Sequence, residues 1–481
     1  MLDDKTAANV SRIVIARWGD AILPNAPKFS PNALTGAQAD SQFPYDGIIA
    51  GILAQPSAED GIPRLVMVVA TPDVPARMLF PPGQDKPDIA GRIQGATILN
   101  LQYLSGRWVT VDGGYQSRRI SDGTLCQISG PAAGAIGSTV QGVLAPACGT
   151  ATPWGTVLLG EGDTGPWLSR LAGVGYGYAD PAQAPRFGWV VDINPLDPGN
   201  IPIKRTALGR VARGGMVAIL AKDGRPVIFF TEDSPTGCLY RFTAATNATD
   251  GTALDSGTLS VAKISGTGIT WLALGADVPS LVGLSNAAQS AGGSPFDAPG
   301  GLALSADRHA LFMACGGNPA RTTPDALNPG SSAGHIVRFL VGGDVTAPDF
   351  GAEIALIAGD PAIDEGTQYP ANSTAWLRKP RTLGLDAAGS LWIGTDQRGD
   401  TSLTADGLFT LTGSTFSAAY FAPKGAALGG TAFDFGTHIV FSMVRHPGAT
   451  PEASYNFPAT RWPTLQPNMP PQTTLIGLTP A

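Results

Sequence analysis

The chain has 481 residues, of which 62 are glycine and 41 are proline, and only 14% are charged. This density of helix-breaking residues excludes a fold of long helices, and the 43% of hydrophobic residues exclude a disordered chain. The net charge of −7 argues against a general nucleic-acid surface, and no apolar run approaches the ~20 residues that span a bilayer.

The first predicted elements are short strands in the N-terminal half of the chain. Residues 95–114 contain two apolar runs separated by a turn, which is typical of a hairpin. Residues 153–163, followed by 186–193, have the same character and are interpreted as the inner strands of one unit. Between them, residues 165–175 are typical of a short surface helix.

Clearer copies of the hairpin follow along the chain, over residues 214–233, 300–318, 379–397 and 429–448. Each copy begins with small residues, continues as a strand of alternating apolar residues, and turns at an Asp/Gly-type turn. A second strand rich in Ile, Val, Phe or Trp completes it. Three copies continue into a third strand, over residues 237–242, 334–339 and 407–412.

Antiparallel sheets that repeat without helices between them predict an all-β fold, namely a six-bladed β-propeller that forms one domain over residues 1–481. Five units are visible, and the sixth is expected from residues 95–114 or from pairing of the two chain ends. A β-sandwich is the alternative arrangement. Segments near residues 244–298 and 319–333, rich in small residues, are interpreted as loop insertions.

The repeat also predicts which residues meet, because the innermost strand of each propeller blade lines a central channel. One ring at the channel mouth is expected to contain Gly214, Gly300, Arg381 and Gly429. The next loop outward is expected to contain Glu161, Glu232, Asp233, Asn318 and Asp396. Convergent polar groups at such a mouth are typical of a ligand site.

Several motifs follow one another along nearly the whole chain, among them RWGD (17–20), QFPYDG (42–47), ACGTATPWGTVLLGE (147–161), RFGWVVDINPLDPGNIPIKRTALGR (186–210) and LWIGTD (391–396). In this order they resemble the PhoX family of alkaline phosphatases. The resemblance implies a six-bladed propeller and a phosphoester hydrolase with iron and calcium ions near the axis, held by one thiolate and many carboxylates. The ligands that this chain would supply, if metal is retained, are Cys148, Glu161, Glu232, Asp233 and Asp396.

The acidic motifs of the family are altered at six places, which are 70–71, 213–214, 298–301, 380–382, 427 and 445–449. Every change removes acidic residues, and Arg213, Arg381 and Arg445 arise at or beside the altered motifs. Multivalent cations held without carboxylates would leave uncompensated buried charge, so no cofactor is expected, with calcium and iron as the alternative. Guanidinium groups instead fork onto phosphate or carboxylate oxygens.

Three functions are consistent with these patterns. The leading hypothesis is a divergent propeller with a degraded iron and calcium centre, whose arginine-containing axial funnel binds a small anion or phosphoester. The second is an active, metal-dependent phosphoester hydrolase with a reduced metal site. The third is a non-catalytic propeller that binds a protein partner.

The leading hypothesis assigns roles to individual residues. The expected catalytic residues are Glu161, His446, Arg213 and Arg381. The expected substrate-binding residues are Arg213, Arg381, Arg445, Trp154 and Asn318. Structural roles are the alternative: the arginines as salt bridges between blades, Cys148 as a buried thiol, and the acids as turn caps or partners of the arginines.

Cysteines and the N-terminal segment complete the sequence analysis. Cys126, Cys148, Cys238 and Cys315 are far apart and form no CxxC pair, so they are predicted to be reduced, buried thiols. The family resemblance implies export to the periplasm. The first twenty residues show no basic segment followed by an apolar stretch, so no compartment is predicted.

Overall fold

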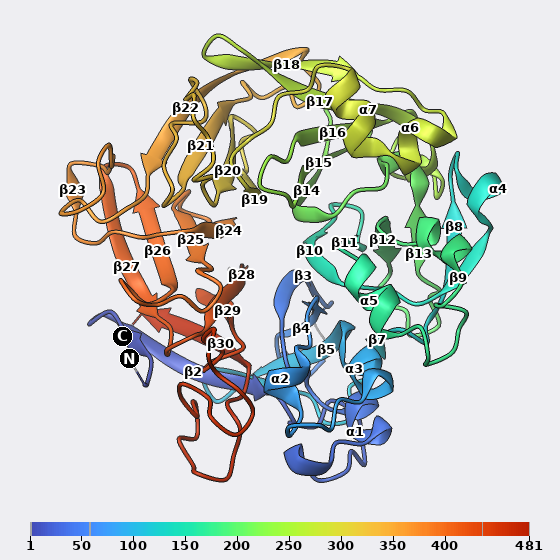
Figure 1. The fold of residues 1–481 in the computed structure, drawn as a ribbon, viewed down its shortest axis with the longest axis vertical. Coiled ribbons are helices and arrows are strands. Elements are labelled where there is room, and N and C mark those ends of the chain that lie inside the picture. The colour runs from blue at the N-terminus through green and yellow to red at the C-terminus, as the bar shows by residue number, and fades with distance from the viewer. Residues whose placement is uncertain (1, 57–58, 435, 481) are drawn as a thin grey trace.

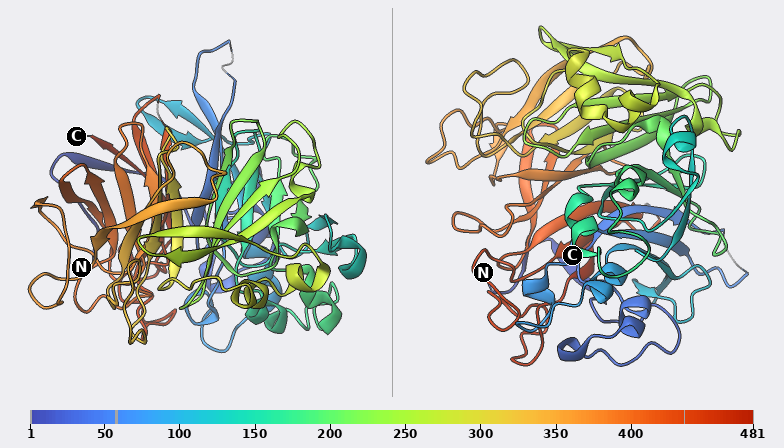
Figure 2. Two further views of the ribbon diagram at one scale, coloured as in Figure 1. Left: turned by 90° about the horizontal axis from the view of Figure 1, so that it is seen from above. Right: turned by 45° about the vertical axis from the view of Figure 1, so that its right-hand side comes forward.

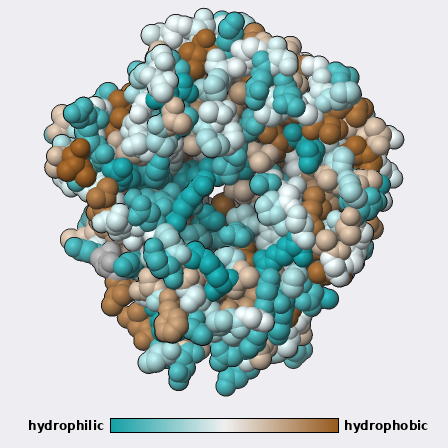
Figure 3. All heavy atoms as spheres, viewed as in Figure 1, coloured by the Kyte–Doolittle hydropathy of each residue, from teal (hydrophilic) through white to brown (hydrophobic). Residues whose placement is uncertain are grey.

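The structure is a computed structural model that describes residues 2–56, 59–434 and 436–480. Six blades of mainly antiparallel strands surround a central axis (Figure 1), which confirms the predicted six-bladed β-propeller. In side view the blades stand next to one another around the axis, and most helices lie towards one end of the strands (Figure 2). Hydrophilic residues gather around a central hollow in the face shown in Figure 3.

One strand from each blade lies closest to the axis. These innermost strands are β3 (Ile48–Ala54), β10 (Pro146–Ala151), β14 (Arg213–Leu220), β19 (Pro299–Leu304), β24 (Pro380–Leu385) and β28 (Ala427–Asp434). They are rich in glycine and alanine, and together they line an axial channel of about 460 Å³.

The outer strands complete the six blades, which follow one another along the chain. The first two blades add β4 (Arg64–Thr71), β5 (Gly95–Leu104), β6 (Arg107–Thr110) and β7 (Arg118–Ile120), then β11 (Val157–Glu161), β12 (Val190–Ile193), β13 (Ile203–Arg205), β8 (Leu125–Ser129) and β9 (Thr139–Gln141). The third and fourth blades add β15 (Pro226–Glu232), β16 (Leu239–Ala244), β17 (Gly257–Ser265) and β18 (Gly268–Ala273), then β20 (Ala310–Cys315), β21 (His335–Leu340) and β22 (Asp349–Ile357). Pairing of β18 with β22 joins these two blades into one sheet.

The last two blades use both ends of the chain. The fifth blade adds β25 (Leu391–Thr395), β26 (Gly407–Thr412), β27 (Thr415–Phe421), β23 (Asn372–Ser373) and β1 (Lys5–Thr6). The sixth adds β29 (Ile439–Arg445), β30 (Thr474–Pro480) and β2 (Val10–Arg17). Both predicted sources of a further sheet are therefore used: residues 95–114 belong to the first blade, and the chain ends complete the sixth.

Short helices occupy the connections. They are α1 (Gly36–Ser41), α2 (Ala76–Leu79), α3 (Pro87–Ile93), α4 (Ala133–Ile136), α5 (Gly165–Arg170), α6 (Val278–Val282) and α7 (Leu284–Ser290), with 3-10 turns at Pro31–Ala33, Pro181–Arg186, Thr206–Leu208 and Ala253–Asp255. The predicted short helix within 165–175 is confirmed as α5. Within the described part of the chain, no helix combines the length and the apolar character needed to span a membrane.

The two predicted loop insertions differ in the structure. Residues 319–333 form a loop, which is closed by a bridge between Asp325 and Asn328, whereas residues 244–298 do not form a simple loop. Residues 244–298 contain β17, β18 and two helices. Small residues weaken the apolar pattern of β17, but its pairing with β16 buries Leu259 and Val261. Neighbouring strands therefore stabilise a strand that its own composition does not predict.

A register shift recurs at the mouth end of every inner hairpin. The shift leaves an extra residue in the innermost strand, for example Ala147 between Pro146 and Cys148, and Arg381 between Pro380 and Thr382. Similar shifts occur in the hairpins that begin with β3, β14, β19 and β28. A bulge re-aims the unpaired residue, so these positions converge at the end of the channel.

Candidate functional site

A cavity of about 680 Å³ lies at the mouth of the axial channel. We call it the mouth cavity. It is lined by bulged residues of the inner strands and by the loops that follow the second strands of the blades. Of the predicted ring and loop residues, Gly214, Arg381, Asp233, Asn318 and Asp396 line it.

Arg381 enters the mouth cavity from the bulge of β24. Its Nη2 donates to Oδ2 of Asp233 at 2.6 Å, and its side chain keeps 22% of its exposed area. Burial favours the neutral guanidine, but the charge of Asp233 outweighs it and raises the pKa of Arg381. The ion pair bridges the fifth and third blades, so Arg381 connects two blades and also faces the cavity.

Arg445, at the end of β29, holds two carboxylates. Its Nε and Nη2 donate to the two oxygens of Asp46 at 2.8 and 2.9 Å, and its Nη1 lies 3.4 Å from Oδ2 of Asp396. Asp46 is fully buried. Burial alone would raise the pKa of Asp46 and of Asp396, but Arg445 holds both below their usual range. This fork geometry is the strong form of an arginine–carboxylate pair.

Other charged residues of the mouth cavity were not predicted. Asp73 lines it, and burial together with the charge of Asp46 raises the pKa of Asp73. Lys379 and Arg398 also line it; the Nζ of Lys379 donates to the carbonyls of Gly316 and Ser332, at 2.9 and 2.6 Å. Asp46 lies in the motif QFPYDG, which could have drawn attention to it. Lys379 is the first residue of the hairpin 379–397, and Arg398 directly follows it.

The structure does not bring Arg213 to the mouth cavity. Its guanidinium is fully buried, donates to the carbonyls of Leu208, Gly209, Val211 and Gly188, and stacks 4.7 Å from the ring of Phe230. Burial lowers its pKa to about 10. With its terminal nitrogens occupied by backbone carbonyls inside the protein, Arg213 cannot reach an anion in the cavity.

Two predicted acids also point into the blades. Glu161 is fully buried: Oε1 accepts from Leu144 N and Lys204 Nζ, both at 2.8 Å, and Oε2 accepts from Gly188 N and Trp189 N. Glu232 accepts from the hydroxyl of Tyr240 at 3.0 Å. These contacts are the structural alternative foreseen for the acids, since both carboxylates satisfy partners within their own blades.

Three further predicted residues lie away from the lining of the mouth cavity. Cys148 is a buried free thiol, and burial raises its pKa to about 12; all four cysteines are free and buried, as predicted. Trp154 lies in the turn between β10 and β11, at the end of the hairpin opposite Glu161. His446 follows Arg445, but its backbone N–H donates to Thr473 and its ring does not line the cavity.

The donor set does not fit the iron and calcium centre that the family implies. Glu161 and Glu232 are occupied within the blades, Asp233 and Asp396 are paired with arginines, and the thiol of Cys148 is held protonated. No group of three His, Cys, Asp or Glu side chains in residues 2–56, 59–434 and 436–480 is arranged to hold a metal ion. Glu161, Asp233 and Asp396 are each paired with a cationic side chain instead.

Comparison with known proteins places the chain in a family. The sequence profile described as alkaline phosphatase PhoX matches residues 6–448, and no curated protein matches. Pseudomonas fluorescens PhoX in complex with vanadate, a transition-state analogue, is 23% identical over 100% of this chain and 96% of that chain, with a TM-score of 0.87. At this identity the similarity concerns the fold.

Two other solved structures are far less similar. A gluconolactonase from Xanthomonas campestris is 12% identical over 71% of this chain and 76% of its own, with a TM-score of 0.33. A putative 6-phosphogluconolactonase from Bacteroides uniformis is 11% identical over 82% and 77%, with a TM-score of 0.34. Neither adds to the argument about the site.

Proposed function

The chain belongs to the PhoX alkaline phosphatase family, and from this premise we propose that its mouth cavity binds a phosphoester or a similar small anion through guanidinium groups. In this proposal the iron and calcium centre of the family is degraded. Arg381 and Arg445 provide the positive charge that the retained carboxylates need, and no step of binding passes through a metal.

The observation that carries the proposal is that the Arg381 guanidinium makes a hydrogen bond through only one of its nitrogens to the described residues. Only its Nη2 has a described partner, Asp233, while its Nε and Nη1 have none among the described residues and are not enclosed. The side chain lines a cavity large enough for a small substrate. The two open nitrogens carry three N–H bonds, which can make charge-assisted hydrogen bonds to phosphate oxygens.

A neighbouring group supports an anion at this place. Arg398 is exposed and lines the cavity, and its guanidinium has no hydrogen bond or ion pair with any residue that the structure describes. An oxyanion at the open guanidinium edge of Arg381 would therefore share the cavity with a second cation that has no described countercharge.

A metal-dependent phosphoester hydrolase with a reduced site is the second candidate. It is favoured by the family and by three carboxylates that line the one cavity, Asp73, Asp233 and Asp396. Hard oxygen ligands of this kind suit calcium. Elemental analysis of the purified protein separates the candidates, because stoichiometric iron or calcium supports the second and contradicts the first.

Calorimetric titration with inorganic phosphate and phenyl phosphate tests the first candidate. Arg381→Ala is expected to weaken binding about tenfold or more, because it removes hydrogen bonds to a charged ligand. Arg338→Ala is the matched control, since Arg338 is an exposed arginine that pairs with Glu353 far from the mouth. Absence of binding to the unaltered protein, or equal affinities of the two variants, would reject the proposal.

Hydrolysis is measured separately with a chromogenic phosphomonoester, with and without added calcium. Turnover that requires calcium and is lost with Asp233→Asn supports the metal-dependent candidate. Turnover without added metal that follows Arg381 supports a phosphatase whose site uses guanidinium groups alone.

A further inference from the structure

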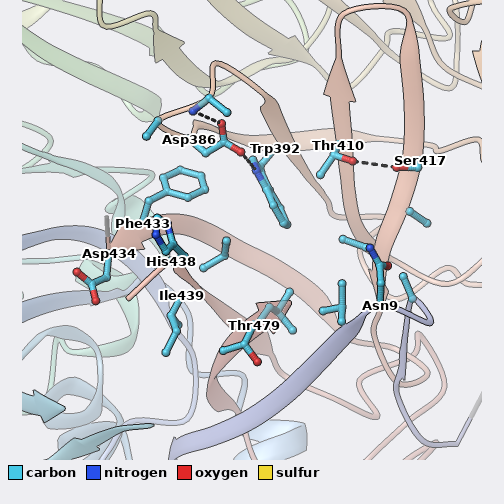
Figure 4. Close-up of a pocket in the computed structure, with 18 residues that line it drawn as sticks. Asn9, Asp386, Trp392, Thr410, Ser417, Phe433, Asp434, His438, Ile439 and Thr479 are labelled. Carbon is cyan, nitrogen blue, oxygen red and sulfur yellow. Dashed lines mark hydrogen bonds between the residues drawn. The ribbon is translucent and has the colours of Figure 1, made fainter. Parts of the chain in front are cut away.

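A second cavity, of about 610 Å³, lies between the fifth and sixth blades. We call it the interblade cavity (Figure 4). It is bordered by the hairpin turns after β24 and β28, at the ends of these strands opposite the mouth, and by the segment between β1 and β2. Neither candidate function at the mouth cavity uses it.

The wall from the fifth blade carries hydroxyl groups. Trp392 pairs with Thr410, and Thr410 with Ser417, so the three side chains form one row across the same face of the blade. The hydroxyls of Thr410 and Ser417 lie 3.0 Å apart. A hydroxyl pair retains acceptor capacity after this single bond, so this wall can accept a hydrogen bond from a ligand.

The wall from the sixth blade is apolar. Phe433, Val440 and Leu478 form the facing row, again through direct cross-strand pairing. Thr410 and Ser417, on the opposite wall, have short side chains, and an open space remains between the fifth and sixth blades.

The charge of the interblade cavity is acidic. Asp386 lies beside the indole of Trp392 and accepts its Nε1–H at 2.9 Å, and the rings of Trp392 and Phe433 meet at 6.1 Å. Asp434 is a second carboxylate of the lining and accepts from Trp108 on its far side. Among the described lining residues there is no lysine or arginine.

We propose that the interblade cavity is a binding site for a small organic cation with a flat apolar body. The apolar body packs between the row of the sixth blade and the indole of Trp392, as expected for a cavity of this size and lining. The ammonium group lies near the carboxylate of Asp386 and the aromatic rings, where charge attraction and the ring quadrupole act together.

A series of three indoles of nearly equal size tests the proposal by calorimetry or ligand-observed NMR. Tryptamine is a cation, tryptophol is neutral, and indole-3-acetate is an anion. We expect millimolar or tighter binding of tryptamine, at least about fivefold tighter than indole-3-acetate, because one nearby carboxylate changes the binding free energy by about 1 kcal/mol. Failure of all three to bind, or equal affinity for all three, would overturn the proposal.

Two variants locate the binding. Asp386→Asn is expected to weaken tryptamine binding about fivefold or more, because it removes the charge. The amide also loses one of the hydrogen bonds that the carboxylate accepts, and the smaller loss of tryptophol binding measures that part of the effect. Ser417→Phe fills the cavity and is expected to abolish binding of both compounds. Thermal melting checks that each variant folds, and Arg338→Ala again serves as the control. Unchanged affinity in a folded Ser417→Phe protein would place the indoles elsewhere and reject the site.

Discussion

The mouth cavity and the interblade cavity are similar in volume, about 680 and 610 Å³, but they are built in different ways. Bulges and loops from several blades bring the charged groups of the mouth cavity together. The interblade cavity instead arises from two facing rows of regular strands. Residues distant in sequence thus create a charged site at the axis, whereas a local choice of short side chains creates an apolar one between blades.

Charge compensation is the sharpest difference between the cavities. At the mouth, Arg445 pairs with Asp46 and Asp396, and Arg381 pairs with Asp233. At the interblade cavity the described partners of the Asp386 carboxylate are all uncharged, namely the indole of Trp392 and two backbone N–H groups. The mouth therefore depends on its arginines for stability, and the interblade cavity retains a net attraction for cations.

The largest expected effect tests this dependence. Arg445→Ala should lower the free energy of unfolding by about 3–5 kcal/mol, because it leaves Asp46 buried without its countercharge. Arg338→Ala removes an arginine whose pair with Glu353 is exposed, and should cost no more than about 1 kcal/mol. Urea unfolding of both variants provides the measurement. Equal losses would mean that the mouth arginines do not act as internal counterions.

Some of the mouth cavity could be predicted from the sequence because the repeat fixes equivalent positions. Matching the hairpins placed Arg381 level with Gly214, and the structure brings both to the cavity. The loop positions Asp233, Asn318 and Asp396 follow from the same match. A repeat is informative here because radial symmetry converts sequence spacing into a ring.

Arg213 shows why the remaining residues were misplaced. It precedes the bulged Gly214 by one residue, and successive side chains of a strand point to opposite faces. A family motif locates the segment, but a one-residue step decides whether a guanidinium faces the cavity or the blade interior. Glu232 and Asp233 differ in the same way, since Glu232 contacts Tyr240 and only Asp233 reaches Arg381.

The interblade cavity was beyond prediction from sequence for a different reason. The strands that carry Trp392 and Val440 were both within predicted hairpins. Their facing arrangement depends on how the fifth and sixth blades pack, and the sixth is closed by strands from both chain ends. Hydrophobic periodicity identifies a strand but does not show whether the space in front of it is filled.

The second prediction concerns Asp406, a buried carboxylate close to the mouth. It accepts from the hydroxyl of Thr395 at 2.6 Å, and burial, with the charge of Asp396, raises its pKa from 3.8 to about 8. Between these values the unfolded chain releases the proton while the folded protein keeps it. The contribution of this group to the free energy of unfolding is therefore fully present below about pH 4. It is lost progressively as the pH rises to about 8.

Asp406→Asn removes this titration, so its stability relative to the unaltered protein should rise by a few kcal/mol between about pH 4 and pH 8. Unfolding in urea at several pH values measures the difference. Parallel pH profiles for Asp406→Asn and the unaltered protein would contradict the prediction.

The smallest expected effect tests whether the two cavities are independent. Arg381→Ala should weaken phosphate binding about tenfold and leave tryptamine affinity within about twofold, because bulk charge at the mouth is screened over the distance between the sites. Asp386→Asn should do the reverse, weakening tryptamine about fivefold without a comparable change for phosphate. Titrating both ligands against both variants gives four affinities. If either variant weakened the binding of both ligands equally, a shared change in the fold would explain the losses. The division into an anion site at the axis and a cation site between blades would then fail.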